Sequence, residues 1–290
     1  MKGALLILGR GIGQVMFQNN ALSGLLMLVG ILLNSWQMAL LAIAGNVVST
    51  LAAYFSGYSR EDIRNGLYGF NGTLVGIAIG VFMPITVASL LLLVTGSCLS
   101  TWIARLFGLQ RLVSGFTAPF IISVWILLVA CNWMMPSLLL PSGDVVTAQT
   151  LSFLQAFCLN IGQVMFQGNT VLAGVFFLLG ILVNSSINGL YTILGALLPI
   201  PFALLLGVDY AALNAGLMGY NGVLCAIALG DKTWKGGVWA VMAVLLSVLL
   251  QIGGMEWGIT TLTAPFVVAV WIVAGLQQLD RKAKTETANG

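Results

Sequence analysis

The sequence contains no histidine, and Asp, Glu, Lys and Arg together make up 7% of its 290 residues. No carboxylate or lysine lies inside the apolar stretches that we predict to span a membrane. Ion-coupled pumps and proton relays place ionisable residues within the membrane, and hydrolases of the bilayer need a nucleophile with a base, or a metal centre. These absences argue against a pump, a symporter and an enzyme.

Three other signatures are missing as well. There is no Gly-x-x-x-x-Gly-Lys-Ser/Thr phosphate loop, which argues against ATP use. The net charge is only +3 and no basic tract is present, which argues against nucleic-acid binding. The cysteines stand singly in apolar runs without metal-ligand spacing, so we expect buried structural thiols and no metal or cofactor. They are Cys98, Cys131, Cys158 and Cys225.

Apolar residues are abundant, at 59% of the chain, with a mean hydropathy of +1.04. Soluble domains are roughly 45–50% apolar and about 25% charged. Uncharged blocks such as 65–104 and 145–208 are long enough for several spans, since about 20 residues cross a bilayer as a helix. The apolar patch within the first ten residues is too short for a signal-peptide core with a cleavage site, so we expect it to be retained. The composition predicts an all-α integral membrane protein.

We predict two similar sets of helices. Each set begins with a short helix, at 4–18 and at 150–167, and continues with five membrane spans. The spans of the first set are 22–34, 37–56, 65–82, 85–105 and 117–133. The spans of the second set are 172–184, 187–207, 211–230, 236–254 and 263–279.

The two sets share sequence. The hexapeptide Gly13–Gln18 returns unchanged at Gly162–Gln167, and three further blocks recur in the same order. These are Leu22–Ser35 with Leu172–Ser185, Gly66–Leu74 with Gly216–Leu224, and Thr117–Trp125 with Thr263–Trp271. Four matching blocks in one order indicate an internal duplication.

Charge orients the two copies, because Lys and Arg concentrate in cytoplasmic loops. With the N-terminus inside and five spans in each half, every basic residue falls on the cytoplasmic side. Those residues are Lys2, Arg10, Arg60, Arg64, Arg105, Arg111, Lys232, Lys235, Arg281, Lys282 and Lys284, and the opposite loops carry Asp144, Asp209 and Glu256.

The basic loops follow spans two and four in the first half but spans three and five in the second. The halves are therefore expected to be inverted, with a site at the membrane midplane between them. We divide the chain into a first repeat at 1–133, an extracytoplasmic linker at 134–149, a second, inverted repeat at 150–279 and a cytoplasmic tail at 280–290.

Neutral polar residues at matching positions remain as candidates for a pore. Each can hydrogen-bond a neutral solute, and the short helices would end within the membrane, where free backbone groups can face only protein or a water-filled path. The pairs are Gln14 with Gln163, Thr117 with Thr263, and Asn71 with Asn221.

Each pair also has a purely structural interpretation. A membrane glutamine can bond two helices, and Thr-Ala-Pro-Phe can cap and start a helix as readily as it can line a pore. For the asparagines we favour a structural role, because Gly-x-Asn-Gly suggests close helix packing. Repeated aromatic residues beside these pairs suggest a flat constriction. For Gln18 and Gln167 we identify no role.

Three of these motifs resemble signatures of the urea transporter family. Gln14–Gly24 resembles its Gln-x-x-Phe-x-x-Asn-x-x-Ser-Gly pattern, and Leu67–Gly76 and Phe116–Phe120 resemble two others. Both halves match, from about residue 10 to residue 279.

The resemblance implies a homotrimer in a bacterial inner membrane, with both termini cytoplasmic. Each protomer would have its own pore between two inverted halves, each of five spans plus a tilted pore helix. A slot in that pore would be formed by Phe17, Phe166, Phe70, Tyr220, Leu74 and Leu224. Oxygen ladders would come from helix-end carbonyls together with Gln14, Gln163, Thr117 and Thr263. Some bacterial members carry glutamate at the threonine positions, and Tyr220 departs from an all-phenylalanine slot.

Urea suits such a pore, because it is planar and neutral and can slide edgewise between aromatic faces. An ion would lose several kcal/mol of hydration with no counter-charge available, and passage requires weak binding at several points. We therefore expect passive, facilitated diffusion of urea with no coupling ion. The alternatives are a channel for another small neutral solute, such as a short amide, glycerol, ammonia or water, and a membrane scaffold whose duplication serves packing. The pore histidines of ammonia channels and the paired Asn-Pro-Ala of water channels are absent.

Overall fold

A computed structural model describes residues 2–110, 113–141 and 147–289, and every regular element in these ranges is a helix. In the first half a side-chain cap starts each of two consecutive helices: Asn20 accepts from the backbone of Leu22 and Ser23, and Ser35 accepts from Met38. The first-half elements are α1 (Lys2–Gln14), α2 (Ala21–Asn34), α3 (Trp36–Phe55), α4 (Arg60–Arg64), α5 (Gly69–Phe82), α6 (Val87–Gln110), α7 (Ala118–Met134) and the 3-10 turn η1 (Pro136–Leu138).

The second half begins its helices in the same way. Thr170 and Ser185 accept from backbone amides at the starts of its second and third helices. The elements are α8 (Phe153–Gly162), the 3-10 turn η2 (Gln163–Met165), α9 (Val171–Asn184), α10 (Ser186–Leu197), α11 (Pro199–Leu205), α12 (Tyr210–Asn214), α13 (Tyr220–Leu229), α14 (Trp234–Glu256) and α15 (Ala264–Asn289).

These bounds confirm half of the predicted helices in outline and correct six. The predicted short helix 150–167 is α-helical only over Phe153–Gly162 and continues as the 3-10 turn η2. The predicted span 187–207 is divided into α10 and α11. The predicted spans 65–82 and 211–230 are shorter, beginning at Gly69 and Tyr220, because Gly66 and Gly216 adopt φ of +75° and +74° and end a short preceding helix. The predicted short helix 4–18 ends its α-helical part at Gln14. The last helix continues to Asn289, through the stretch that we predicted as a tail.

Among the described residues, four helical stretches are long and apolar enough to cross a membrane, at 36–55, 87–110, 186–205 (α10 followed by α11) and 234–256. Between them stand apolar helices of 10–17 residues, among them α5, α7, α9 and α13. The shortest of them, α13 with 10 residues, is too short for a complete crossing at 1.5 Å per residue. Helix ends must therefore lie within the interior of the bundle, where protein groups have to satisfy their backbone atoms.

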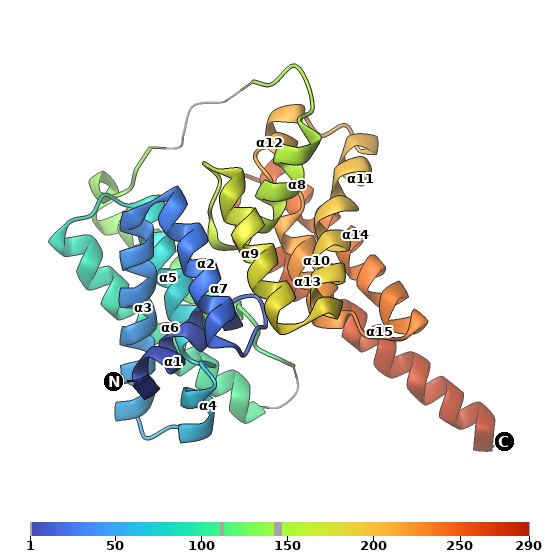
Figure 1. Ribbon diagram of the computed structural model, residues 1–290, viewed down its shortest axis with the longest axis horizontal. Coiled ribbons are helices and arrows are strands. Elements are labelled where there is room, and N and C mark those ends of the chain that lie inside the picture. The colour runs from blue at the N-terminus through green and yellow to red at the C-terminus, as the bar shows by residue number, and fades with distance from the viewer. Residues whose placement is uncertain (1, 111–112, 142–146, 290) are drawn as a thin grey trace.

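The two halves lie side by side in Figure 1, with α4 at the lower edge and α12 at the upper. α2 and α9 meet at the centre of the boundary. A Cβ at Gly30 would lie 2.9 Å from the Phe177 ring, and one at Gly180 would lie 2.9 Å from the Ser23 carbonyl oxygen. Glycine therefore lets the two helices approach closely.

Within each half, glycine also allows the short first helix to pack on its neighbour. A Cβ at Gly24 would lie 1.7 Å from the Gly9 carbonyl oxygen, and one at Gly174 would lie 1.9 Å from that of Cys158. No side chain fits at such distances. These contacts fix α1 against α2 and α8 against α9, and so place the ends of α1 and α8.

Basic residues cluster around one end of the first half. Arg10 donates from Nη1 to the Arg64 carbonyl oxygen at 3.0 Å, and Arg60 and Arg105 lie over the rings of Tyr54 and Tyr58. In the second half, the turn before α14 is closed by Asp231, whose pKa is held below its ordinary value by bonds from the Thr233 hydroxyl and backbone. Arg111 and Asp144, used above to orient the chain, lie outside the described residues.

We predict that Gly24→Ala destabilises the fold. The added methyl group must push α2 away from α1, and overpacking of this kind costs about 1–3 kcal/mol. The midpoint of thermal unfolding of the detergent-solubilised protein should fall. Gly275→Ala is the matched control, because a Cβ at Gly275 meets nothing within 4 Å. An unchanged midpoint for Gly24→Ala would contradict the close approach of α1 and α2.

Candidate transport pathway

The hydroxyl groups of Thr117 and Thr263 meet at the centre of the molecule, 2.7 Å apart. Both side chains are only 2% exposed, and they stand immediately before α7 and α15. Thr117 occupies the N-cap position of α7 but makes no side-chain cap hydrogen bond. Of the two roles we considered for this threonine, helix cap and pore lining, the first is therefore wrong for its side chain. The hydroxyl instead joins the two halves.

Asparagines from the preceding helices supply the missing caps. The Asn71 Oδ1 accepts from the Phe120 backbone N–H at 3.1 Å, and the Asn221 Oδ1 accepts from the Phe266 N–H at the same distance. Both asparagines are buried. Gly72, next to Asn71, also packs tightly against the Gly45 carbonyl. The structural role predicted for the asparagines is confirmed.

The two candidate glutamines stand at the ends of the short helices. Gln14 Nε2 donates to the Asn65 carbonyl oxygen at 3.0 Å, and Gln163 Nε2 donates to that of Ala215 at 2.9 Å. Both glutamines are half-buried. Each recorded bond uses one amide hydrogen and ties the end of a short helix to the loop that precedes α5 or α13. The side-chain oxygen can still accept a hydrogen bond.

Four residues at matching positions of the two halves adopt left-handed backbone conformations. They are Phe17 (φ 62°), Phe116 (φ 44°), Phe166 (φ 60°) and Leu262 (φ 50°). Such a conformation in a residue other than glycine costs on the order of 1–3 kcal/mol, and it persists only where surrounding contacts enforce it. Around Phe17 that contact is the tight turn closed by the bond from Gln18 N–H to the Gly13 carbonyl oxygen.

The aromatic rings gather in two clusters. The Phe17 ring centroid lies 6.0 Å from Phe116 and 6.1 Å from Phe266, edge to face. The Phe166 centroid lies 6.2 Å from Phe120 and 6.3 Å from Phe82 in the same geometry. Each cluster therefore contains rings from both halves of the chain. Phe17 and Phe166 belong to different clusters.

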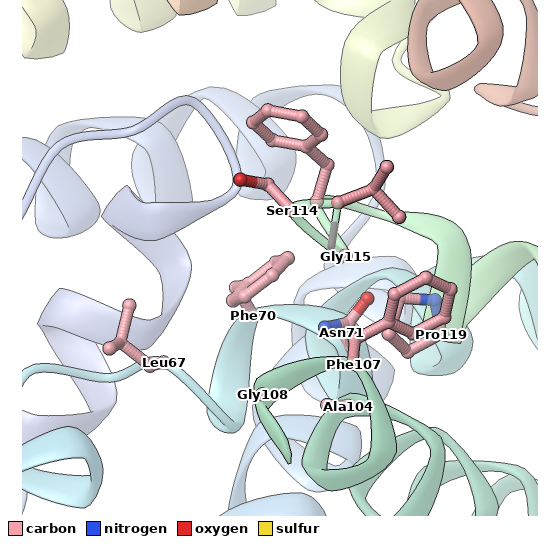
Figure 2. A pocket seen from close by; sticks show the side chains of 11 residues that line it. Leu67, Phe70, Asn71, Ala104, Phe107, Gly108, Ser114, Gly115 and Pro119 are labelled. Atoms are coloured by element: carbon pink, nitrogen blue, oxygen red, sulfur yellow. The ribbon is translucent and has the colours of Figure 1, made fainter. Parts of the chain in front are cut away.

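The other predicted slot residues have different surroundings. Leu74 and Leu224 are fully buried. Phe70 is half-buried and lines a cavity of about 470 Å³ beside α6 and the segment before α7 (Figure 2). Tyr220 is 8% exposed, and its hydroxyl donates to the Leu262 carbonyl oxygen at 2.6 Å. Tyr220 thus differs from Phe70 in being anchored at its tip.

Gln18 and Gln167, to which sequence reasoning gave no role, are fully buried at the boundary between the halves. Gln18 Oε1 accepts from Asn184 Nδ2 at 2.9 Å, and the Asn169 backbone N–H donates to Asn34 Oδ1 at 2.9 Å. The first bond connects the end of α9 to the turn after α1, and the second connects the end of α2 to the turn before α9. In the sequence, the identical hexapeptides and the Asn-Ser pairs at the ends of α2 and α9 were the features that could have indicated this role.

Two tryptophans make a second reciprocal connection. Trp125 Nε1 donates to the Thr260 carbonyl oxygen at 2.7 Å, and Trp271 Nε1 donates to that of Ser114 at 2.9 Å. Each bond crosses from one half to the other. The segments that lead into α7 and α15 are therefore held by the opposite half.

Sequence comparison decides the family. A sequence model described as the urea transporter family matches residues 5–278. The chain belongs to the urea transporter family. It is similar to urea transporter 1 of Rattus norvegicus, with 33% identity over an alignment of 262 positions that covers 82% of this chain and 67% of the relative. It is also similar to urea transporter 1 of Ovis aries, with 32% identity over an alignment of 265 positions that covers 83% of this chain and 67% of that protein.

Membership in this family settles the main functional prediction. The chain is a multi-pass membrane protein that mediates facilitated transport of urea, and it is not an enzyme. The candidate residues suit a neutral solute, because they are threonines, glutamines, phenylalanines, leucines and one tyrosine. A urea transporter needs hydrogen-bonding groups that hold its solute weakly, and these side chains provide them without charge.

We predict that the threonine pair is energetically coupled. Thr117→Val leaves the buried Thr263 hydroxyl unpaired, which costs about 1–3 kcal/mol, whereas replacing both partners by isosteric apolar groups can be nearly neutral. Thermal unfolding of the single variants and of Thr117→Val/Thr263→Val measures this. The double variant should be more stable than the sum of the two single losses implies. Strictly additive losses would show that the hydroxyl groups do not bond each other.

Proposed function

We propose that urea crosses the membrane along a pathway between the two halves of each protomer. The pathway residues are those that the sequence singled out, and they act as weak hydrogen-bonding groups and as apolar walls. They are Gln14, Phe17, Phe70, Leu74, Thr117, Gln163, Phe166, Tyr220, Leu224 and Thr263.

The observation that carries this proposal is the hydrogen bond between Thr117 and Thr263. It brings two residues 146 positions apart to one point, immediately before two helices whose first turns are packed in the interior. Because neither hydroxyl serves as a helix cap, each retains the capacity to exchange its partner for a passing amide. The threonine pair is then the narrowest polar point of the pathway.

The glutamines and aromatic rings extend the same argument to either side. A urea N–H can donate to the side-chain oxygen of Gln14 or Gln163, since the recorded bonds of these glutamines use only the amide nitrogen. The Phe17 and Phe166 clusters supply apolar walls drawn from both halves. Urea then trades water for protein hydrogen bonds without entering a tight site.

The finer architecture belongs to the same proposal. The two halves, 1–133 and 150–279, are inverted repeats of five spans plus a pore helix, with 134–149 as an extracytoplasmic linker and 280–290 as a cytoplasmic tail. Support comes from the reciprocal bonds of Trp125 and Trp271, which exchange roles between halves. It also comes from the opposite positions of α4 and α12 in Figure 1.

The orientation follows from charge. Arg10, Arg60, Arg64 and Arg105 gather at the α4 end, toward which the C-terminal part of α15 also runs in Figure 1. Placing that end in the cytoplasm satisfies the positive-inside rule. We propose a bacterial inner-membrane location with both termini cytoplasmic.

We predict that Gln14→Ala lowers urea flux through reconstituted vesicles by about tenfold, since losing one hydrogen bond of roughly 1.4 kcal/mol changes a rate by that factor. Stopped-flow light scattering measures the flux. Gln155→Ala is the matched control, because Gln155 is an exposed glutamine on α8. Equal flux through both variants would remove Gln14 from the pathway.

We further predict a homotrimer in which each protomer has its own pathway. A native mass measurement in detergent should give three times the protomer mass of 30.6 kDa. Mixed trimers containing one Gln14→Ala protomer should lose about a third of the flux, because the pathways act independently. A monomeric mass, or a loss of the whole flux, would contradict this arrangement.

A further inference from the structure

Gln18 follows Phe17 directly, and its two nitrogen atoms fix the backbone on both sides of that residue. The Gln18 backbone N–H donates to the Gly13 carbonyl oxygen at 3.0 Å, and the side-chain Nε2 donates to the Met16 carbonyl oxygen. The first bond holds the peptide plane after Phe17, and the second holds the plane before it. Because the orientations of these two planes define φ and ψ of Phe17, the two bonds together enforce its left-handed conformation.

The Gln18 side chain is itself held by the other half of the chain. It is fully buried, and its Oε1 accepts from Asn184 Nδ2 at 2.9 Å. The Asn184 Oδ1 in turn accepts from Asn20 Nδ2 at 3.3 Å. Asn184 is the last residue of α9 and is not one of the pathway residues proposed above. A residue of the second half therefore helps to fix the turn that carries Phe17.

The second half contains the same residue types but not the same connection. Gln167 Nε2 donates to the Met165 carbonyl oxygen and lies 3.8 Å from the Met38 sulfur, a weak acceptor. Its Oε1 has no hydrogen-bond partner among the described residues, and neither has Nδ2 of Asn34, which corresponds to Asn184. Within the part of the chain that the structure describes, the glutamine oxygen is thus anchored across the boundary in the first half alone.

We infer that Gln18 and Asn184 are positioning residues that set the width of the slot at Phe17. The inference rests on the proposed pathway and adds residues that determine which solutes pass, although they do not line it. The Phe17 ring lies edge to face with Phe116 and with Phe266 of the other half. When the bond between Gln18 and Asn184 is lost, the left-handed turn can relax and the ring moves relative to both neighbours. A wall that moves in this way admits solutes bulkier than urea.

N,N′-dimethylurea tests this inference, because it keeps the carbonyl group of urea but is bulkier at both nitrogen atoms. Gln18→Met retains the length of the side chain and removes its donor and its acceptor. We expect it to raise the ratio of dimethylurea flux to urea flux in proteoliposomes by about threefold, which is at the lower end of what one hydrogen bond is worth. A residue that only stabilises the fold would lower both fluxes alike. An unchanged ratio in folded Gln18→Met protein would overturn the inference.

A second variant covers the case in which Gln18→Met does not fold. Asn184→Leu removes the donor at an exposed position and leaves Gln18 in place, so it should raise the ratio by the same factor. Asn34→Leu is the matched control, because it changes the last residue of α2, whose Nδ2 holds no glutamine among the described residues, and it should keep the ratio. Equal ratios for Asn184→Leu and Asn34→Leu would overturn the inference. So would a double variant Gln18→Met/Asn184→Leu in which the two effects multiply, since residues that act through one bond are not additive.

Phe17→Ala separates this inference from the pathway itself. If Phe17→Ala raises the ratio while Gln18→Met and Asn184→Leu do not, the slot stands and the positioning role is overturned. If Phe17→Ala leaves both fluxes and their ratio unchanged, the proposed slot fails at Phe17, and the inference that rests on it fails with it.

Discussion

The fold depends on satisfying helix ends that stop inside an apolar bundle. α7 and α15 begin in the interior, where their first backbone N–H groups have no water to bond. Asn71 and Asn221 meet this requirement from neighbouring helices, each through a buried side-chain oxygen. Because the asparagines act as the caps, Thr117 and Thr263 do not have to, and their hydroxyl groups meet each other instead. Polar groups without charge can then exist at the centre of the protein at low cost.

The second constraint is that the interior depends on contacts between the two halves. Three parts of the interior are held by the opposite half: the segments before α7 and α15 by Trp271 and Trp125, and the Phe17 ring by Phe266. Close packing of α2 on α9 through Gly30 and Gly180 sets the distance over which these contacts act. A pathway built between halves in this way can be narrow and still retain its width, because interhelical glycine contacts resist compression.

The sequence was sufficient to predict the all-helical architecture and the structural role of the asparagines, since each has a local or periodic signal. It could not show the left-handed backbone of Phe17 and Phe166, because nothing in a phenylalanine signals positive φ. It also missed Gln18, whose partner Asn184 lies 166 positions away. Contacts over such separations depend on how two elements are placed in three dimensions. The roles of the predicted slot residues in transport also depend on such placement, and flux measurements test them.

Duplication explains why the halves resemble each other, but the differences between them carry more functional information. In the second half, Gln251 Oε1 accepts from the Asn221 amide and from the Thr261 hydroxyl, whereas the Asn71 amide nitrogen of the first half has no hydrogen-bond partner among the described residues. Asn71 and Asn221 therefore cap α7 and α15 in the same way but have different surroundings. Because facilitated diffusion has no energy source, such a difference between the halves cannot accumulate urea on either side of the membrane, and the net flux at equal concentrations stays zero.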